Sequence, residues 1–225
     1  GAEISEKSFA AVVDTLGESE KVQGAMVNRA SLPVTVIERL MMVVSDNLKE
    51  QLSNRQDLSP DLTDGILTQS REKAVLGLST EIGEDSVLSL VRQLLTHDRL
   101  TPSIVLRAAC MGNIMFLECA MAERAGISVK NARALIKDSG ELGLKSLFAK
   151  AGLPDNFFPA IQAAIEVEQE IEYDGGERDQ ERFARRMIER ILTQFGDLGV
   201  DMESDDLEYL LAKMTELPAD INHNA

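Results

Sequence analysis

Two cysteines in the segment RAACMGNIMFLECA, residues 107–120, are the side chains of this sequence best suited to metal or redox chemistry. Thiolates bind zinc, and two neighbouring thiols can form a redox pair. In a single helix, however, the nine-residue step from Cys110 to Cys119 would rotate the two thiols by about 900°, onto opposite faces. The two histidines, His97 and His223, form no common zinc spacing with them. We therefore predict two buried, reduced and metal-free thiols, with a redox pair as the alternative.

One carboxylate, Glu118, lies in a stretch where nine of the thirteen residues from Asn113 to Ala125 are apolar. Gly112-Asn113 predicts a helix break before this stretch, which then forms a central helix. A buried charge without a partner is very costly, so Glu118 must be paired, hydrogen-bonded or directed into a groove. Because no second carboxylate, histidine or nucleophile stands at a useful spacing, we predict a structural glutamate. A partly buried acid in a cleft is the alternative. We expect no catalytic residue, cofactor or metal.

The segment ECAMAERAGISVKNARALIK, residues 118–137, matches a helix-turn-helix pattern. Ala122 would lie in the first helix, Gly126 at the turn and Ile127-Ser128 at the start of the second helix. The second helix would display side chains of the types that contact bases and phosphates: Lys130, Asn131, Arg133 and Lys137. A glycine-linked helix pair is also a common way to turn any α-hairpin. DNA binding through residues 129–137 is therefore the alternative function, and the overall charge weighs against it.

The negative charge of the chain is concentrated at its C-terminal end. The net charge is −15, with 17 basic and 21 acidic residues in 1–165 but 6 basic and 17 acidic residues in 166–225. Such a balance repels nucleic acids and anionic membranes on average. The N-terminal GAEISEKSF is polar and acidic, unlike a signal peptide, and the apolar run from Ala108 to Leu117 is too short to span a membrane. We expect a cytoplasmic protein without a membrane partner. Because it begins with Gly rather than Met, residue 1 need not be its natural start.

Helical periodicity runs through most of the chain. From Val36 onwards, apolar residues recur at steps of three and four, on one face of a helix: Val36, Ile37, Leu40, Met41, Val44, Leu48 and Leu52. Similar patterns occupy residues 62–78, 87–95, 157–171, 183–195 and 207–214. Helix starts are marked by prolines at Leu32-Pro33, Ser59-Pro60, Thr101-Pro102 and Leu153-Pro154, with Ser59 and Thr101 as N-caps. The sequence predicts an all-α fold of stacked helical hairpins, either an α-solenoid-like array or an irregular helical bundle.

The central run LTPSIVLRAACMGNIMFLECAMAERAGIS, followed by GLKSLFAKAGLP, resembles a bacterial, alphaproteobacterial family of uncharacterised all-helical proteins. The resemblance depends on the helix start Leu100-Thr101-Pro102, on Gly112, on the helix from Phe116 to Ala122 and on the turn from Lys150 to Pro154. Where the family pattern has two aromatic residues before the glutamate, this chain has Phe116-Leu117. The resemblance covers about residues 30–170 and implies a helical fold, but it implies no activity.

A glycine pair, Gly175-Gly176, predicts a hinge between a helical-hairpin array at 1–172 and an acidic helical extension at 177–225. The first helix of the extension, residues 177–195, combines an apolar stripe with a row of arginines, Arg178, Arg182 and Arg185. The stripe must be covered. The same chain can cover it as a cap, or the helix can dock on a partner or on a second copy.

The function that the sequence favours is a non-enzymatic protein-interaction or regulatory helical module, because the chain has helical repeats and lacks a catalytic constellation. We expect a protein partner, which the sequence does not identify, or self-association. A DNA-binding regulator that uses the segment 118–137 is the alternative, and an enzyme built around Glu118 ranks last.

Overall fold

The computed structural model describes residues 6–17, 19–27, 32–53, 60–138 and 141–171, together with 182, 183, 185–187, 189 and 190. Within these residues every regular element is a helix, so the predicted all-α class is confirmed. The helices are α1 (Glu6–Leu16), α2 (Glu20–Val27), α3 (Val34–Ser53), α4 (Pro60–Thr80), α5 (Glu84–Thr96), α6 (Pro102–Cys110), α7 (Ile114–Ala125), α8 (Val129–Ile136), α9 (Glu141–Ala151), the 3₁₀ helix η1 (Asp155–Phe157) and α10 (Phe158–Glu170).

The chain divides into two compact units, Gly1–Thr96 and His97–Ala225. No linker or shift of composition near Thr96 predicts this division. The predicted hinge at Gly175-Gly176 lies outside the described residues, as does the predicted helix at 207–214. The described residues between 182 and 190 are helical and belong to the second unit.

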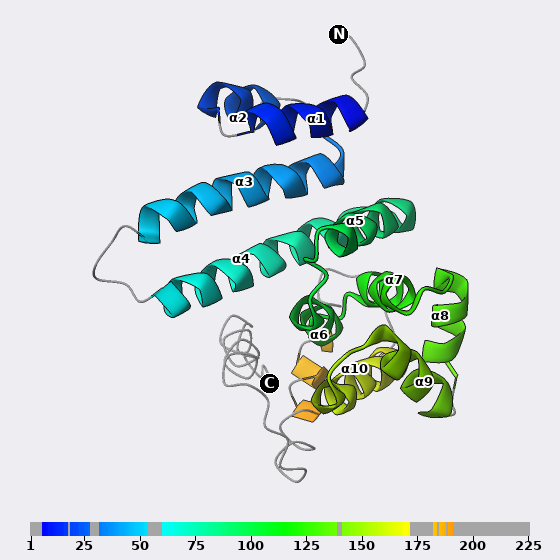
Figure 1. The fold of residues 1–225 in the computed structure, drawn as a ribbon. Helices are drawn as coiled ribbons and strands as arrows, with labels where there is room; N and C mark the ends of the chain where they lie inside the picture. Colours follow the sequence, from blue (N-terminus) through cyan, green and yellow to red (C-terminus); the bar gives the residue numbers. More distant parts are fainter. Residues whose placement is uncertain are drawn as a thin grey trace, which may run out of the picture. The chain divides into compact units, whose positions relative to one another are not determined.

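In the first unit, α3 lies between the α1–α2 pair and the α4–α5 pair (Figure 1). Its N-terminal half packs on α1 and α2 through a cluster of buried apolar residues: Phe9, Val13, Met26, Val36 and Leu40. On the other side, the amide nitrogen of Gln93 in α5 donates to the Thr35 carbonyl oxygen at 2.9 Å and to the buried carboxylate of Glu38. Helix α3 therefore packs on different neighbours with different sides, and its apolar periodicity alone did not predict which residues face which neighbour.

In the second unit, α7 is the central helix and contacts α6, α8 and α9, while α10 packs on α6 (Figure 1). The α7 side chains from Phe116 to Ala122 are all buried. The predicted break before α7 is confirmed, because α6 ends at Cys110 and Gly112 has a positive φ of 71°. A Cβ atom at position 112 would lie 2.7 Å from Cδ1 of Phe183, so this site requires glycine for two reasons.

The helix starts follow the predicted capping pattern with one exception. Thr101 caps α6, since its hydroxyl oxygen accepts a hydrogen bond from the Ile104 amide at 3.2 Å. The predicted cap Ser59 lies outside the described residues. At Leu153-Pro154 a helix begins as predicted, but its first turn, Asp155–Phe157, is a 3₁₀ helix, and the α-helix α10 begins at Phe158. An α-helix that began after Pro154 would need an N–H at Pro159, and proline has none.

Candidate functional site

The α7–α8 hairpin contains most of the residues that the sequence singled out. Gly126 ends α7 in the left-handed conformation, with φ 63°, and Ser128 caps α8 by accepting a hydrogen bond from the Asn131 amide at 3.3 Å. The two helices and the glycine turn that the sequence predicted at 118–137 are therefore present. Ala132 and Ile136 face inward and are buried. The opposite, exposed side of α8 is the surface that this hairpin offers to a binding partner.

The carboxylate of Glu118 forms an ion pair with Arg133 of α8. Glu118 Oε2 lies 2.6 Å from Arg133 Nε, and the side chains are 5% and 35% exposed, respectively. The pair joins a buried acid on α7 to a half-buried arginine on α8, and so holds the two helices together. Glu118 therefore has the structural partner that the sequence required. Arg133, predicted to contact a partner or nucleic acid, has its Nε engaged by this carboxylate.

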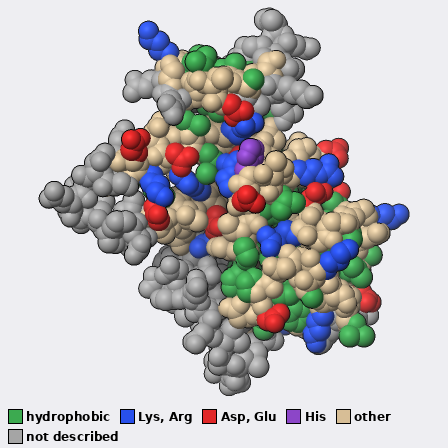
Figure 2. Space-filling model, viewed as in Figure 1, with side chains coloured by type: hydrophobic (Ala, Val, Ile, Leu, Met, Phe, Trp, Pro, Cys, Tyr) green, Lys and Arg blue, Asp and Glu red, His purple; other side chains and the backbone are tan. Residues whose placement is uncertain are grey.

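The other three predicted contact residues of α8, Lys130, Asn131 and Lys137, are exposed. The neighbouring helix α9 packs on α8, and on its outer face Leu142 is 80% exposed and is followed by exposed Lys145, Ser146, Ala149 and Lys150. Residues 126–154 contain five basic and two acidic residues, a net charge of +3 in a chain of −15. Figure 2 shows Lys and Arg side chains alternating with hydrophobic ones over this region. We call the exposed residues Lys130, Asn131, Lys137, Leu142, Lys145 and Lys150 the α8–α9 face.

Arg124 of α7 connects two distant turns of the second unit. Its Nη1 donates to the Leu100 carbonyl oxygen at 2.6 Å, its Nε to Ala151 at 2.8 Å and its Nη2 to Gly152 at 3.2 Å. Burial lowers the pKa of the Arg124 guanidinium below its ordinary value. The acceptors belong to the Leu-Thr-Pro start and the Lys-Ala-Gly-Leu-Pro turn on which the resemblance depends. The sequence analysis did not predict that Arg124 joins these two turns, although the two motifs themselves marked both turns as notable.

Cys110 and Cys119 are both buried, and neither forms a disulfide bond. Cys110 ends α6 and Cys119 lies in the middle of α7, so the thiols come from different helices. Their burial agrees with the prediction that they pack as small apolar side chains. No three His, Cys, Asp or Glu side chains in the described residues form a group that could hold a metal ion.

The segment 182–190 packs against its own unit. Phe183 and Met187, which the sequence placed in the apolar stripe, are buried, and Phe183 contacts the backbone at Gly112. Arg182 and Arg185 of the predicted arginine row are exposed, and Arg178 lies outside the described residues. The described part of this stripe is therefore covered by the chain itself, as the capping alternative expected.

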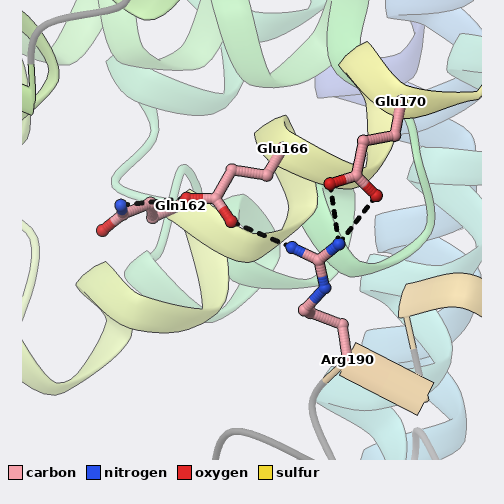
Figure 3. A network of polar contacts seen from close by, with 4 residues as sticks. All are labelled: Gln162, Glu166, Glu170 and Arg190. Atoms are coloured by element: carbon pink, nitrogen blue, oxygen red, sulfur yellow. Dashed lines mark hydrogen bonds and ion pairs between the residues drawn. The ribbon is translucent and has the colours of Figure 1, made fainter.

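An arginine that the sequence did not single out, Arg190, fastens this segment to α10 (Figure 3). Its guanidinium lies between two carboxylates one helical turn apart, with Nη1 3.1 Å from Glu166 Oε2 and Nη2 2.7 Å from Glu170 Oε2. Gln162 donates to the other Glu166 oxygen at 3.0 Å. The hydrogen bond from Arg190 lowers the pKa of Glu170 below its ordinary 4.5. The Glu-x-x-x-Glu spacing on α10 was the available signal for this pair.

Removal of the Arg190 guanidinium is expected to loosen the segment at neutral pH. The lowered pKa of Glu170 means that the ion pair stabilises the fold above pH 4.5 and that this stabilisation is lost as the pH falls through the folded value. Arg190→Ala should therefore melt below the wild type at pH 7, and the difference should shrink below pH 4.5. Arg186→Ala is the control, since Arg186 acts on Glu170 by charge alone and should cause the smaller change. A difference in melting temperature that is independent of pH would contradict this role.

The comparisons with known proteins identify a family but no characterised relative. No curated protein and no solved structure matches the chain. Each helix in the described part of the chain is too short or too polar to span a bilayer. One family model matches residues 1–201, a longer stretch than the resemblance at 30–170, and it confirms a bacterial family without an assigned function. The alphaproteobacterial origin stays a prediction. Because the match covers most of the sequence, the chain belongs to the family described as "Uncharacterised protein conserved in bacteria (DUF2336)".

Proposed function

We propose that this chain is a non-enzymatic protein-interaction module that binds an acidic, amphipathic segment of a partner protein on the α8–α9 face. The observation that carries the proposal is Leu142, the most exposed of the large apolar side chains in the described residues, with lysines on either side. Interfaces combine an apolar anchor with a polar rim, and complementary charge steers the partner to the site. A positive face on a strongly negative chain meets this description.

The arrangement of α9 supports a helical or extended peptide as the partner. Leu142, Lys145, Ser146 and Ala149 recur at steps of three and four, so they form one continuous outer face of the helix. Small side chains at Ser146 and Ala149 leave room for an apolar residue of the partner beside Leu142. The surrounding lysines would then pair with carboxylates at the rim of the contact.

A DNA-binding regulator is the second candidate, because α7 and α8 are joined by a short glycine turn and Lys130, Asn131 and Lys137 are exposed. Two features make it the weaker hypothesis. Arg133, the residue of the set best suited to bidentate contact with guanine, is held by Glu118 at 2.6 Å. A leucine that is 80% exposed fits a protein surface better than a phosphate backbone.

Site-specific photo-cross-linking distinguishes the two candidates. A photoreactive residue replaces Leu142 in one full-length variant and Leu16, an exposed leucine of the first unit, in the control. After irradiation in a bacterial lysate, we expect position 142 alone to give a discrete protein adduct whose cross-linked peptide is acidic. Lys130→Glu with Lys137→Glu should reduce the adduct at least about tenfold, because both rim charges are reversed. A nucleic-acid adduct, an adduct that survives the charge reversal or no adduct at all would overturn the proposal.

A further inference from the structure

One side of the α3–α4 hairpin carries apolar side chains that the described residues leave exposed. Val44 and Leu48 of α3 are 50% and 45% exposed, and Ile66 of α4 is 53% exposed. On α3 they continue a run at steps of four, three and four, which we call the α3 stripe: Ile37, Met41, Val44 and Leu48. On α4 the corresponding run, the α4 stripe, has small residues after its first member: Ile66, Ser70, Ala74 and Gly77. Apolar faces of this kind mark interaction sites.

Two ion pairs fix the register of the hairpin and show that both stripes lie on the same side. Lys49 pairs with Asp64 at 2.9 Å, and Arg71 pairs with Asp46 at 2.5 Å. At 100° per residue, the centre of the α3 stripe lies about 110° from Lys49 and about 170° from Asp46 around its helix. The centre of the α4 stripe lies about 105° from Arg71 and about 125° from Asp64, in the same rotational sense. Because α3 and α4 run in opposite directions, rotations in the same sense bring both stripes to the same side of the hairpin.

The register also places the members of the two stripes at matching levels. In two antiparallel helices, residues at the same height along the hairpin have sequence numbers with a constant sum. The two ion pairs give sums of 113 and 117, so residues at the same height have numbers that add up to about 115. Leu48 is then level with Ile66 and Val44 with Ser70. Met41 is level with Ala74, and Ile37 with Gly77. Large side chains on α3 therefore lie beside small residues on α4 at three of the four levels.

This pattern is complementary to itself. A two-fold axis parallel to the hairpin and midway between its helices would place α3 of one copy over α4 of the other. Each large α3 side chain of one copy would then meet a small α4 residue of its partner, as ridges fit into grooves. At Gly77 a Cβ atom would have no neighbour within 4 Å, so the side of α4 is open there to receive such a side chain.

Charge and area are consistent with a second copy as the occupant. The eight stripe residues are all uncharged, so two copies of net charge −15 can meet here with little repulsion. Asp46 and Glu50 lie about 150–170° around α3 from the stripe. On the face that Figure 2 shows, acidic and basic side chains lie over α3 and α4. Each stripe spans twelve residues, or about 18 Å, so the paired side measures roughly 18 Å by 20 Å and buries about 700 Å² over two copies. An area of this size is typical of a weak contact, so the dimer should form only at high protein concentration.

We propose that the protein forms a symmetric, concentration-dependent dimer in which the α3 stripe of each copy packs on the α4 stripe of the other. This surface belongs to the first unit and is separate from the α8–α9 face. The dimer would present two copies of that face, which allows bivalent binding of a partner.

A pair of glycine variants on α4 tests the dimer. Gly77 lies in the α4 stripe, whereas Gly65 lies about 135° around α4 from the centre of this stripe, and both have open space for a Cβ atom. Gly77→Leu should therefore leave the monomer folded but raise the dimer dissociation constant at least about tenfold, measured by analytical ultracentrifugation of the full chain. Gly65→Leu, with the same change of residue on the same helix, should leave the constant unchanged. Circular dichroism checks that both variants are folded, and Val44→Glu gives a second disruption at a half-exposed site.

Cysteine cross-linking tests the geometry. The natural cysteines are buried, so introduced surface thiols report on the interface alone. Val44→Cys combined with Ser70→Cys should form a disulfide-linked dimer on mild oxidation, whereas each single variant should not. A wild type that stays monomeric at about 100 μM, a concentration where weak dimers form, would overturn the proposal. So would equal behaviour of the two glycine variants, or efficient cross-linking by Val44→Cys alone, which would place α3 on α3.

Discussion

Leu117→Asp is expected to unfold the second unit or to lower its free energy of unfolding by at least about 4 kcal/mol. Leu117 is 0% exposed at the centre of α7, which contacts three other helices. An aspartate there would lose the apolar contacts of leucine and would bury a carboxylate among apolar side chains. Position 117 lies about 100° around α7 from Glu118, the residue that Arg133 contacts, so this guanidinium is not placed to neutralise the new charge. Chemical denaturation followed by far-UV circular dichroism measures the effect.

Leu142→Asp is the matched control for this substitution. Leu142 is 80% exposed, so the same exchange of residues removes little buried area and leaves the new carboxylate in water. We expect a change within about 0.5 kcal/mol. A Leu117→Asp protein that melts like the Leu142→Asp protein would mean that α7 is not the centre of the second unit.

Arg133→Ala is expected to cost about 2–4 kcal/mol, because it removes the partner of a carboxylate that is only 5% exposed. The loss should be smaller than for a fully buried pair, since the Arg133 side chain is itself 35% exposed and water can partly replace it. Lys130→Ala on the same helix is the control, because Lys130 is exposed. Urea denaturation of the three proteins under identical conditions measures the difference.

The double variant Glu118→Gln with Arg133→Ala separates the pair from the individual side chains. If Arg133 stabilises the fold by neutralising Glu118, removal of the charge on Glu118 should recover part of the stability lost in Arg133→Ala. Strictly additive losses would contradict this explanation. The same comparison bears on function. An Arg133→Ala protein that stays folded but loses the cross-link at position 142 would indicate that Arg133 also contacts the partner.

The sequence analysis did not predict the ion pairs of Arg133 and Arg190, and the reason is the same for both. It placed Arg133 on the surface of α8 and Glu118 inside α7, and each placement agrees with the structure. It did not join them, since their pairing depends on the angle between two helices. Arg190 was missed in the same way, because its partners on α10 precede it by 20 and 24 residues.

The sequence by itself determined the helices, the break at Gly112, the cap at Thr101, the start of the helix at Ser128 and the burial of the thiols. These features depend on contacts between residues three or four apart, on glycine and proline at single positions, or on the apolar character of the surrounding segment, and so a local pattern suffices to predict them. Only the tertiary structure decided which helices meet, where the chain divides into units and which charged side chains pair. Arg124 shows the reason: its guanidinium joins Leu100 to Ala151 and Gly152 across separations of 24 to 28 residues, and such contacts depend on how every helix between them packs.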